Sequence, residues 1–194
     1  SGVATGLCQP IQFTKLTTGE YHTCAIDAAG AAYCWGYNNY GQVGDGTTIT
    51  RPQPVPVGGA NTFAALDAGL YHSCGVTALG GAKCWGFNGQ GRLGDGTSTS
   101  RNTPVDVSGL SSGVAQISAG GAHTCVRTLQ GGAKCWGSNS GGSLGDGTTV
   151  TRTTAVNVSG LAAGVRKIST GTSITCADTA SGLKCWGNND SGQL

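Results

Sequence analysis

Apolar and polar residues alternate in a pattern that returns four times along the chain. In the first copy His22, Cys24 and Ile26 alternate with small or polar residues, which is the period of a β-strand. Turn residues follow at 27–30, and the strand pattern resumes at 32–35. One more strand is expected before each hairpin, at Phe13–Thr18, Phe63–Ala68, Val114–Ala119 and Val165–Thr170. An extended segment is expected after it, at Val55–Val57, Val105–Val107 and Val156–Val158.

Cysteine and tryptophan mark the same points in every copy. The second cysteine of each copy returns after 50, 51 and 50 residues, and Trp-Gly always follows it. A period near fifty with Gly and Trp at fixed positions is typical of a β-propeller with one four-stranded blade per repeat. We therefore expect one all-β domain over 1–194, with about four blades at approximately 11–58, 61–108, 112–159 and 163–194, the last incomplete. Tryptophan suits the wedge between neighbouring blades.

The hairpin register predicts disulfide bonds within blades. A three-residue turn at Ala28–Gly30 places Cys24 opposite Cys34, and opposed residues of antiparallel strands lie within disulfide reach. The second and third repeats give the same register. The fourth hairpin is one residue shorter and needs an even-numbered loop. The expected bridges are Cys24–Cys34, Cys74–Cys84, Cys125–Cys135 and Cys176–Cys185. The alternative is eight free, buried thiols.

Composition limits the partners and the cellular location that can be expected for the chain. The net charge of +2, from scattered side chains, is too small for a nucleic-acid or membrane surface. No apolar run is long enough for a membrane-spanning helix, and any signal peptide is expected to be already removed or never present. No C-x-x-C motif occurs. Paired cysteines favour an oxidising, extracellular location, either secreted or at a cell surface.

Two motifs resemble the regulator of chromosome condensation repeat family. They are Gly-x-x-His-[Thr/Ser] and Trp-Gly-x-Asn-x-x-Gly-x-[Leu/Val]-Gly, the second present at Trp35–Gly44, Trp85–Gly94 and Trp136–Gly145 and cut short at Trp186–Leu194. The resemblance implies a β-propeller, commonly of seven blades. Family members include a nuclear exchange factor for a small GTPase and secreted bacterial proteins, some of which inhibit β-lactamases. The cysteine pairs resemble the secreted branch. Ile174 departs from the motif, since the other repeats carry histidine there.

The two ends of the sequence suggest an open ring. The last repeat stops at Leu194, before its Gly-Asp-Gly loop and outer strand. We therefore expect either a window from a longer array, which is favoured, or a propeller that other chains complete. Cys8 has no equivalent in the other repeats. We expect it to bond a cysteine outside 1–194, the alternative being a buried free thiol.

Repeated polar residues are candidates for chemistry, but structural roles fit them better. His22, His72 and His123 could ring an axis and bind metal, yet repeated hydrogen bonding is favoured because Ile174 breaks the set. Asp45, Asp95 and Asp146 lie one per loop, which favours turns over calcium sites. Arg51, Arg101 and Arg152 are expected to contact a loop carbonyl or the nearby aspartate. No catalytic set stands out, so no enzyme activity, metal or cofactor is expected.

Function should lie where the repeats differ, because the repeated residues build the fold. Aromatic residues and arginine concentrate in the first two repeats, and these types are enriched in binding hot spots. The candidate binding residues, expected near one rim, are Tyr21, Tyr37, Tyr40, Tyr71, Phe87 and Arg92. The alternative is that these rings merely cover blade edges. Asn157 and Asn189 begin weak glycosylation motifs.

Two functions are expected from this pattern. The first is a secreted, non-enzymatic module that binds a protein or a cell-surface component. The alternative is a structural subunit of an extracellular fibre or surface layer, joined between chains by blade completion and disulfides. Self-association would belong to the second. Size in solution separates them, because a discrete particle supports a binding module and open polymers support a structural one.

Overall fold

The computed structural model describes residues 11–194, which form four antiparallel sheets and one short 3-10 helix, η1 (Ser140–Gly142). Blade 1 contains β1 (Phe13–Thr18), β2 (His22–Asp27), β3 (Ala32–Gly36) and β4 (Arg51–Pro56). Blade 2 contains β5 (Phe63–Ala68), β6 (His72–Thr77), β7 (Ala82–Gly86) and β8 (Arg101–Asp106). Blade 3 contains β9 (Val114–Ala119), β10 (His123–Thr128), β11 (Ala133–Gly137) and β12 (Arg152–Asn157). Blade 4 contains β13 (Val165–Thr170), β14 (Ile174–Thr179) and β15 (Gly182–Gly187).

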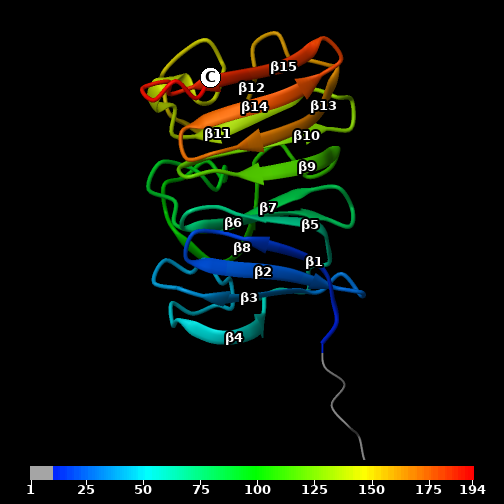
Figure 1. Cartoon of the computed structure of the whole chain (residues 1–194). Helices are drawn as coiled ribbons and strands as arrows, with labels where there is room; N and C mark the ends of the chain where they lie inside the picture. The colour runs from blue at the N-terminus through cyan, green and yellow to red at the C-terminus, as the bar shows by residue number, and fades with distance from the viewer. Residues whose placement is uncertain (1–10) are drawn as a thin grey trace, which may run out of the picture.

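Within each sheet the strands follow one another in chain order (Figure 1). The inner strands β1, β5, β9 and β13 lie next to one another from blade to blade, and the four sheets stack along the chain. This is the all-β propeller architecture that the repeat period indicates. Among residues 11–194, no helix has the length and apolar character needed to cross a bilayer.

The outer strands differ from their predicted bounds. β4, β8 and β12 begin at Arg51, Arg101 and Arg152, four residues before the predicted valine segments, and end one residue before the last valine. These strands pair on one side only, so their alternation of apolar and polar residues is weak. Pro52 and Pro54 fit β4 because an edge strand can leave backbone positions without a hydrogen-bond donor.

The four disulfides pair as the hairpin register predicts. The bonds Cys24–Cys34, Cys74–Cys84, Cys125–Cys135 and Cys176–Cys185 have Cα–Cα distances of 4.1, 4.0, 4.1 and 4.1 Å. In the first hairpin Gly30 adopts φ +85°, which a glycine takes without steric cost. In the fourth, Thr179 pairs with Gly182, so the loop has two residues. Cys8 lies outside the described residues, and its external bond stays a prediction.

The core lies between blades rather than inside any one of them. The disulfide face of blade 1 packs against Phe63 and Trp85 of blade 2, and the disulfide face of blade 2 packs against Trp136 of blade 3. Trp85 and Trp136 are completely buried, as the wedge position requires. Each interface therefore joins a disulfide-bearing face to a tryptophan-bearing face.

Candidate functional site: an aromatic surface on blades 1 and 2

Five aromatic side chains from four turns and loops come together on one rim of the first two blades. Tyr21 lies in the β1–β2 turn, Tyr37 and Tyr40 in the β3–β4 loop, Tyr71 in the β5–β6 turn, and Phe87 in the β7–β8 loop. We call these five rings the aromatic surface. They are brought together because the turn before each histidine strand and the loop after each tryptophan lie at the same end of a blade.

The rings form a continuous set of contacts. Tyr21 stacks on Tyr71 with ring centroids 5.3 Å apart and planes 9° apart. Tyr40 reaches Tyr71 at 5.3 Å and Phe87 at 4.7 Å, so it joins the two blades. Tyr37 touches Tyr21 at 6.0 Å and Tyr71 at 6.3 Å. Tyr21 is 47% exposed and Tyr40 is 38% exposed, so part of the aromatic surface is open to solvent.

Blade 3 shows that the fold does not need four of these rings, those of Tyr21, Tyr37, Tyr71 and Phe87. The backbone N–H of Tyr37 donates to the carbonyl of Tyr21, and Phe87 donates to Tyr71 in the same way. In blade 3 the same bond joins Ser138 to Ala122 with neither ring present, and all three bonds are 2.9 Å long. The backbone of this rim therefore forms equally well with small side chains.

Arg92 is buried and packs its guanidinium against the ring of Phe87, one member of the aromatic surface. It is 4% exposed, and its guanidinium lies 4.7 Å from the centroid of the Phe87 ring. Its Nη1 donates to the carbonyl of Gly121 at 2.8 Å, and its Nη2 donates to Oε1 of Gln90 at 3.2 Å. Burial lowers the pKa of Arg92 to about 10, so it stays charged at neutral pH. Arg92 thus positions Phe87 and is not itself open to a partner.

Tyr21, Tyr37 and Tyr71 line a hollow of about 270 Å³. Glu20, an exposed residue, precedes Tyr21 in the same turn. A hydrogen bond to the Glu20 carboxylate, together with the contact with Tyr71, raises the pKa of Tyr21 to about 12. The phenol of Tyr21 is therefore neutral at neutral pH.

The three histidines join blades by hydrogen bonds, as the repeat analysis favours. His22 Nε2 lies 2.7 Å from Ser73 Oγ, His72 Nε2 lies 2.9 Å from Thr124 Oγ1, and His123 Nε2 lies 2.8 Å from Thr175 Oγ1. Each pair connects one blade to the next. Among residues 11–194, no three His, Cys, Asp or Glu side chains gather as a metal site.

The hydroxyl groups that accept the histidine hydrogen bonds belong to Ser73, Thr124 and Thr175. These residues were not singled out from the sequence. Each donates to a loop carbonyl of the preceding blade, and the tryptophan of its own blade donates to the same oxygen. The three shared carbonyls are those of Gln42, Arg92 and Ser143. A signal was present, since Ser or Thr follows the histidine position in every repeat. The carbonyls cannot be recognised in the sequence, because every residue has a backbone carbonyl.

The Gly-Asp-Gly loops are closed by an aspartate–arginine pair, one of the two expected contacts of the arginines. Asp95 accepts from Asn88 Nδ2, from the backbone and hydroxyl of Thr97, and from Arg101 Nε at 3.0 Å. Blades 1 and 3 repeat this arrangement. The aspartates therefore have structural donors on their oxygens, as turn residues do.

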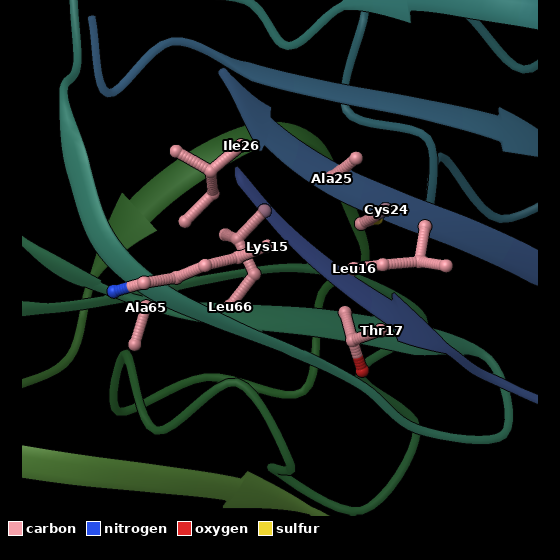
Figure 2. A pocket seen from close by; sticks show the side chains of 8 residues that line it. All are labelled: Lys15, Leu16, Thr17, Cys24, Ala25, Ile26, Ala65 and Leu66. Atoms are coloured by element: carbon pink, nitrogen blue, oxygen red, sulfur yellow. The ribbon is translucent and has the colours of Figure 1, made fainter. Parts of the chain in front are cut away.

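A second hollow lies between the inner strands of blades 1 and 2, with a volume of about 300 Å³ (Figure 2). Figure 2 shows the Lys15 side chain crossing this gap towards Ala65. Its Nζ donates to the carbonyl of Ala64, and Thr17 Oγ1 donates to Asp67 Oδ1 at 3.0 Å. These cross-blade bonds occupy the polar groups of the walls, so the hollow is better explained by packing than by ligand binding.

The fold and the sequence motifs define a class of repeat propeller that known proteins share. The family described as "Regulator of chromosome condensation (RCC1) repeat" matches residues 29–76 and 84–127 in one model, and 13–42 and 114–143 in a second. The chain belongs to this RCC1 repeat family. Its four disulfides fit the disulfide-containing branch.

Individual relatives extend this comparison. The "Probable E3 ubiquitin-protein ligase HERC4" of Rattus norvegicus is 33% identical over 138 residues, which is 70% of this chain and 8% of that protein. The solved structure of human WBSCR16 is similar with a TM-score of 0.82 and 25% identity, covering 94% of this chain and 49% of that one. Yeast RCC1 (Prp20), solved bound to Kap60, has a TM-score of 0.77, 21% identity, and coverage of 92% and 44%. The chain thus spans about half of these structures and a small part of the curated relative.

Proposed function

We propose that this chain is a secreted, non-enzymatic propeller module that binds a protein or cell-surface partner through the aromatic surface. The observation that carries the proposal is the contrast between blades. Blades 1 and 2 place Tyr21, Tyr71, Tyr37 and Phe87 where blade 3 has Ala122 and Ser138 on the same backbone, and Tyr40 where blade 3 has Gly141. Large aromatic side chains that the fold does not require, and that remain partly exposed, are typical of binding hot spots.

Two further observations support parts of this proposal. Four disulfides suit an oxidising compartment, since the cytosol keeps such pairs reduced. The yeast relative was solved in complex with another protein, so a propeller of this fold can serve in protein binding. Repeat propellers vary their loops and turns while the strands stay alike, which is how one fold acquires different partners.

Substitution of the rings by blade 3 and blade 4 residues tests the proposal. A partner is first identified by crosslinking on cells or in secreted fractions, and then purified. The variant carries Tyr21→Ala, Tyr37→Ser, Tyr40→Ser, Tyr71→Ala and Phe87→Ser. We expect at least a 100-fold rise in Kd, because several hot-spot side chains are removed together. The control carries Leu79→Ala and Leu129→Ala, two exposed leucines at the opposite hairpin turns. Equal affinity of both variants would contradict the proposal.

A second candidate, the structural subunit, is favoured by one observation. Leu16 is 66% exposed on the tryptophan-bearing face of blade 1, and Leu183 is 72% exposed on the disulfide-bearing face of blade 4. These are the two kinds of face that pack together inside the chain. Light scattering on the purified chain separates the candidates, because growth into open polymers supports the structural subunit and a discrete monomer supports the binding module.

A further inference from the structure

The aromatic surface already holds one cation. The Arg92 guanidinium lies 4.7 Å from the Phe87 ring centroid, a distance at which the electron-rich face of a ring attracts a positive charge. Arg92 reaches this position from within the fold, held by the carbonyl of Gly121. The ring of Phe87 therefore already has a cation partner from within the chain.

The opposite end of the surface has the same aromatic chemistry and is open. Tyr21 and Phe87 form its two ends, joined through Tyr71 and Tyr40. At the Tyr21 end, Tyr21, Tyr37 and Tyr71 line the hollow of about 270 Å³. This is slightly below the size of pockets that enclose a whole small-molecule ligand, about 300–1,000 Å³. A hollow of this size suits a single side chain from a larger partner.

Charge selects which side chain fits. Glu20 is exposed and directly precedes Tyr21 in the turn between β1 and β2. Within residues 11–194, the ion pairs join Asp45, Asp95, Asp106 and Asp146 to their basic partners, and Glu20 takes part in none of them. The equivalent positions in the other blades are Leu70, Gly121 and Thr172, so this carboxylate is specific to the tyrosine end.

We propose that the hollow formed by Tyr21, Tyr37 and Tyr71 receives a basic side chain, arginine or lysine, of the protein partner, with Glu20 as its counter-charge. This inference rests on the proposed function and gives the partner a chemical property. The tyrosine faces attract the cation and the carboxylate pairs with it at the rim. Nearby, Arg92 lies at the Phe87 end, where the Gly121 carbonyl and Gln90 bind its donors.

Blocked amino acids test the inference without the partner. N-acetyl-arginine amide, N-acetyl-lysine amide and the neutral isostere N-acetyl-citrulline amide are titrated into the chain at constant ionic strength. The readout is the NMR shift of the Tyr21, Tyr37 and Tyr71 ring protons. We expect saturable binding of arginine or lysine with a Kd in the millimolar range, as for one weakly held side chain, and binding of citrulline at least five-fold weaker. The stronger of the two basic probes identifies the side chain.

Two matched variants separate charge from shape. Glu20→Gln removes the counter-charge and is expected to weaken the basic probe about three- to ten-fold while the rings stay in place. Asp106→Asn makes the same charge change at a carboxylate that is 77% exposed and distant from the rings, and it should leave binding unchanged. Equal binding of citrulline and arginine, or no ring shifts with any probe, would overturn this inference. The five-ring variant would still decide the proposed function separately, through affinity for the whole partner.

Discussion

His72 Nε2 lies 2.9 Å from Thr124 Oγ1, and the direction of this hydrogen bond identifies which ring nitrogen carries the proton. Thr124 Oγ1 donates its only proton to the carbonyl of Arg92 at 2.9 Å. It can therefore only accept from His72, so Nε2 must be protonated. Trp136 Nε1 donates to the same Arg92 carbonyl at 2.8 Å, which completes a chain of bonds across the interface between blades 2 and 3.

We expect His22, His72 and His123 to be neutral, with the proton on Nε2, at pH 7. The same donor–acceptor order holds at Ser73 and Thr175, which donate to Gln42 and Ser143. ¹⁵N-edited NMR of the imidazole rings distinguishes the two neutral forms and the cation by their nitrogen shifts. Protonation on Nδ1 in any of the three would contradict the assigned direction of these bonds.

Stability should fall as the pH drops from about 6.5 towards 4. Burial lowers the pKa of His22 and of His123 to about 4, and lowers that of His72 well below its usual value. In the unfolded chain these groups titrate near pH 6.5, so between these values the unfolded state binds more protons and is favoured. The loss is up to about 3 kcal/mol for each of His22 and His123.

Denaturant unfolding followed at several pH values measures this loss. A His123→Gln variant keeps a side-chain donor but does not titrate, so its stability should depend less on pH within the same window. The loop aspartates affect the free energy of unfolding at lower pH than the histidines do. Burial would raise the pKa of Asp146, but the bonds from Thr148 and Arg152 outweigh this and lower it to about 2. A profile that is flat between pH 7 and 4 would contradict the histidine effect.

Asp95→Ala should destabilise the fold by about 2–4 kcal/mol, because it leaves donors of Asn88, Thr97 and Arg101 without their acceptor. Asp106→Ala is the control. Asp106 also pairs with a basic residue, Lys83, at 2.7 Å, but its side chain is 77% exposed. Exposed pairs contribute about 1 kcal/mol or less. Urea midpoints of the two variants compare them directly, and similar losses would contradict the structural role of the loop aspartate.

Gly94→Ala should cost at least about 3 kcal/mol, while Gly109→Ala should cost about 1 kcal/mol. Both glycines have positive φ, +72° and +75°. A Cβ at Gly94 would lie 2.7 Å from Trp136 Nε1 and 2.8 Å from Val107 Cγ1, whereas no atom lies within 4 Å of one at Gly109. The difference between the variants isolates the close approach of the loop to tryptophan. Equal unfolding free energies would contradict this packing.

Mild reductants should open Cys176–Cys185 first. Both of its cysteines are partly exposed on blade 4, whereas those of the other three bridges are fully buried between blades. Timed alkylation under native conditions, followed by peptide mapping, gives the order. The three buried bridges should react only after the chain unfolds, so adding urea should equalise the four rates. Early reduction of Cys74–Cys84 in native buffer would be inconsistent with this order.

Much of the fold could be predicted because it repeats. Register arithmetic around Gly30 was sufficient to pair Cys24 with Cys34, since a hairpin is a local structure. The start of β4 at Arg51 was missed because an edge strand with prolines has little alternation. The ring contacts of Tyr40 with Tyr71 and Phe87 depend on how two blades meet, which no single repeat encodes.

Arg92 illustrates the other limit of the sequence. Its residue type indicates a surface hot spot, yet the structure buries it under Phe87 with its donors directed to Gly121 and Gln90. Glu20, which we propose as part of the site, was not singled out from the sequence, because an isolated exposed carboxylate carries no pattern. The position of Arg92 depends on Gly121, which lies in the next blade.

The shared carbonyls of Gln42, Arg92 and Ser143 have a consequence for how such chains change over time. The joint between blades is made by a main-chain oxygen, so the side chain at that position is free to be glutamine, arginine or serine. A duplicated or transplanted blade of about fifty residues would bring the donors for the joint with the blade before it and the carbonyl for the joint with the blade after it. New rims can therefore arise by recombination of whole blades, with no matching mutation needed in the neighbour.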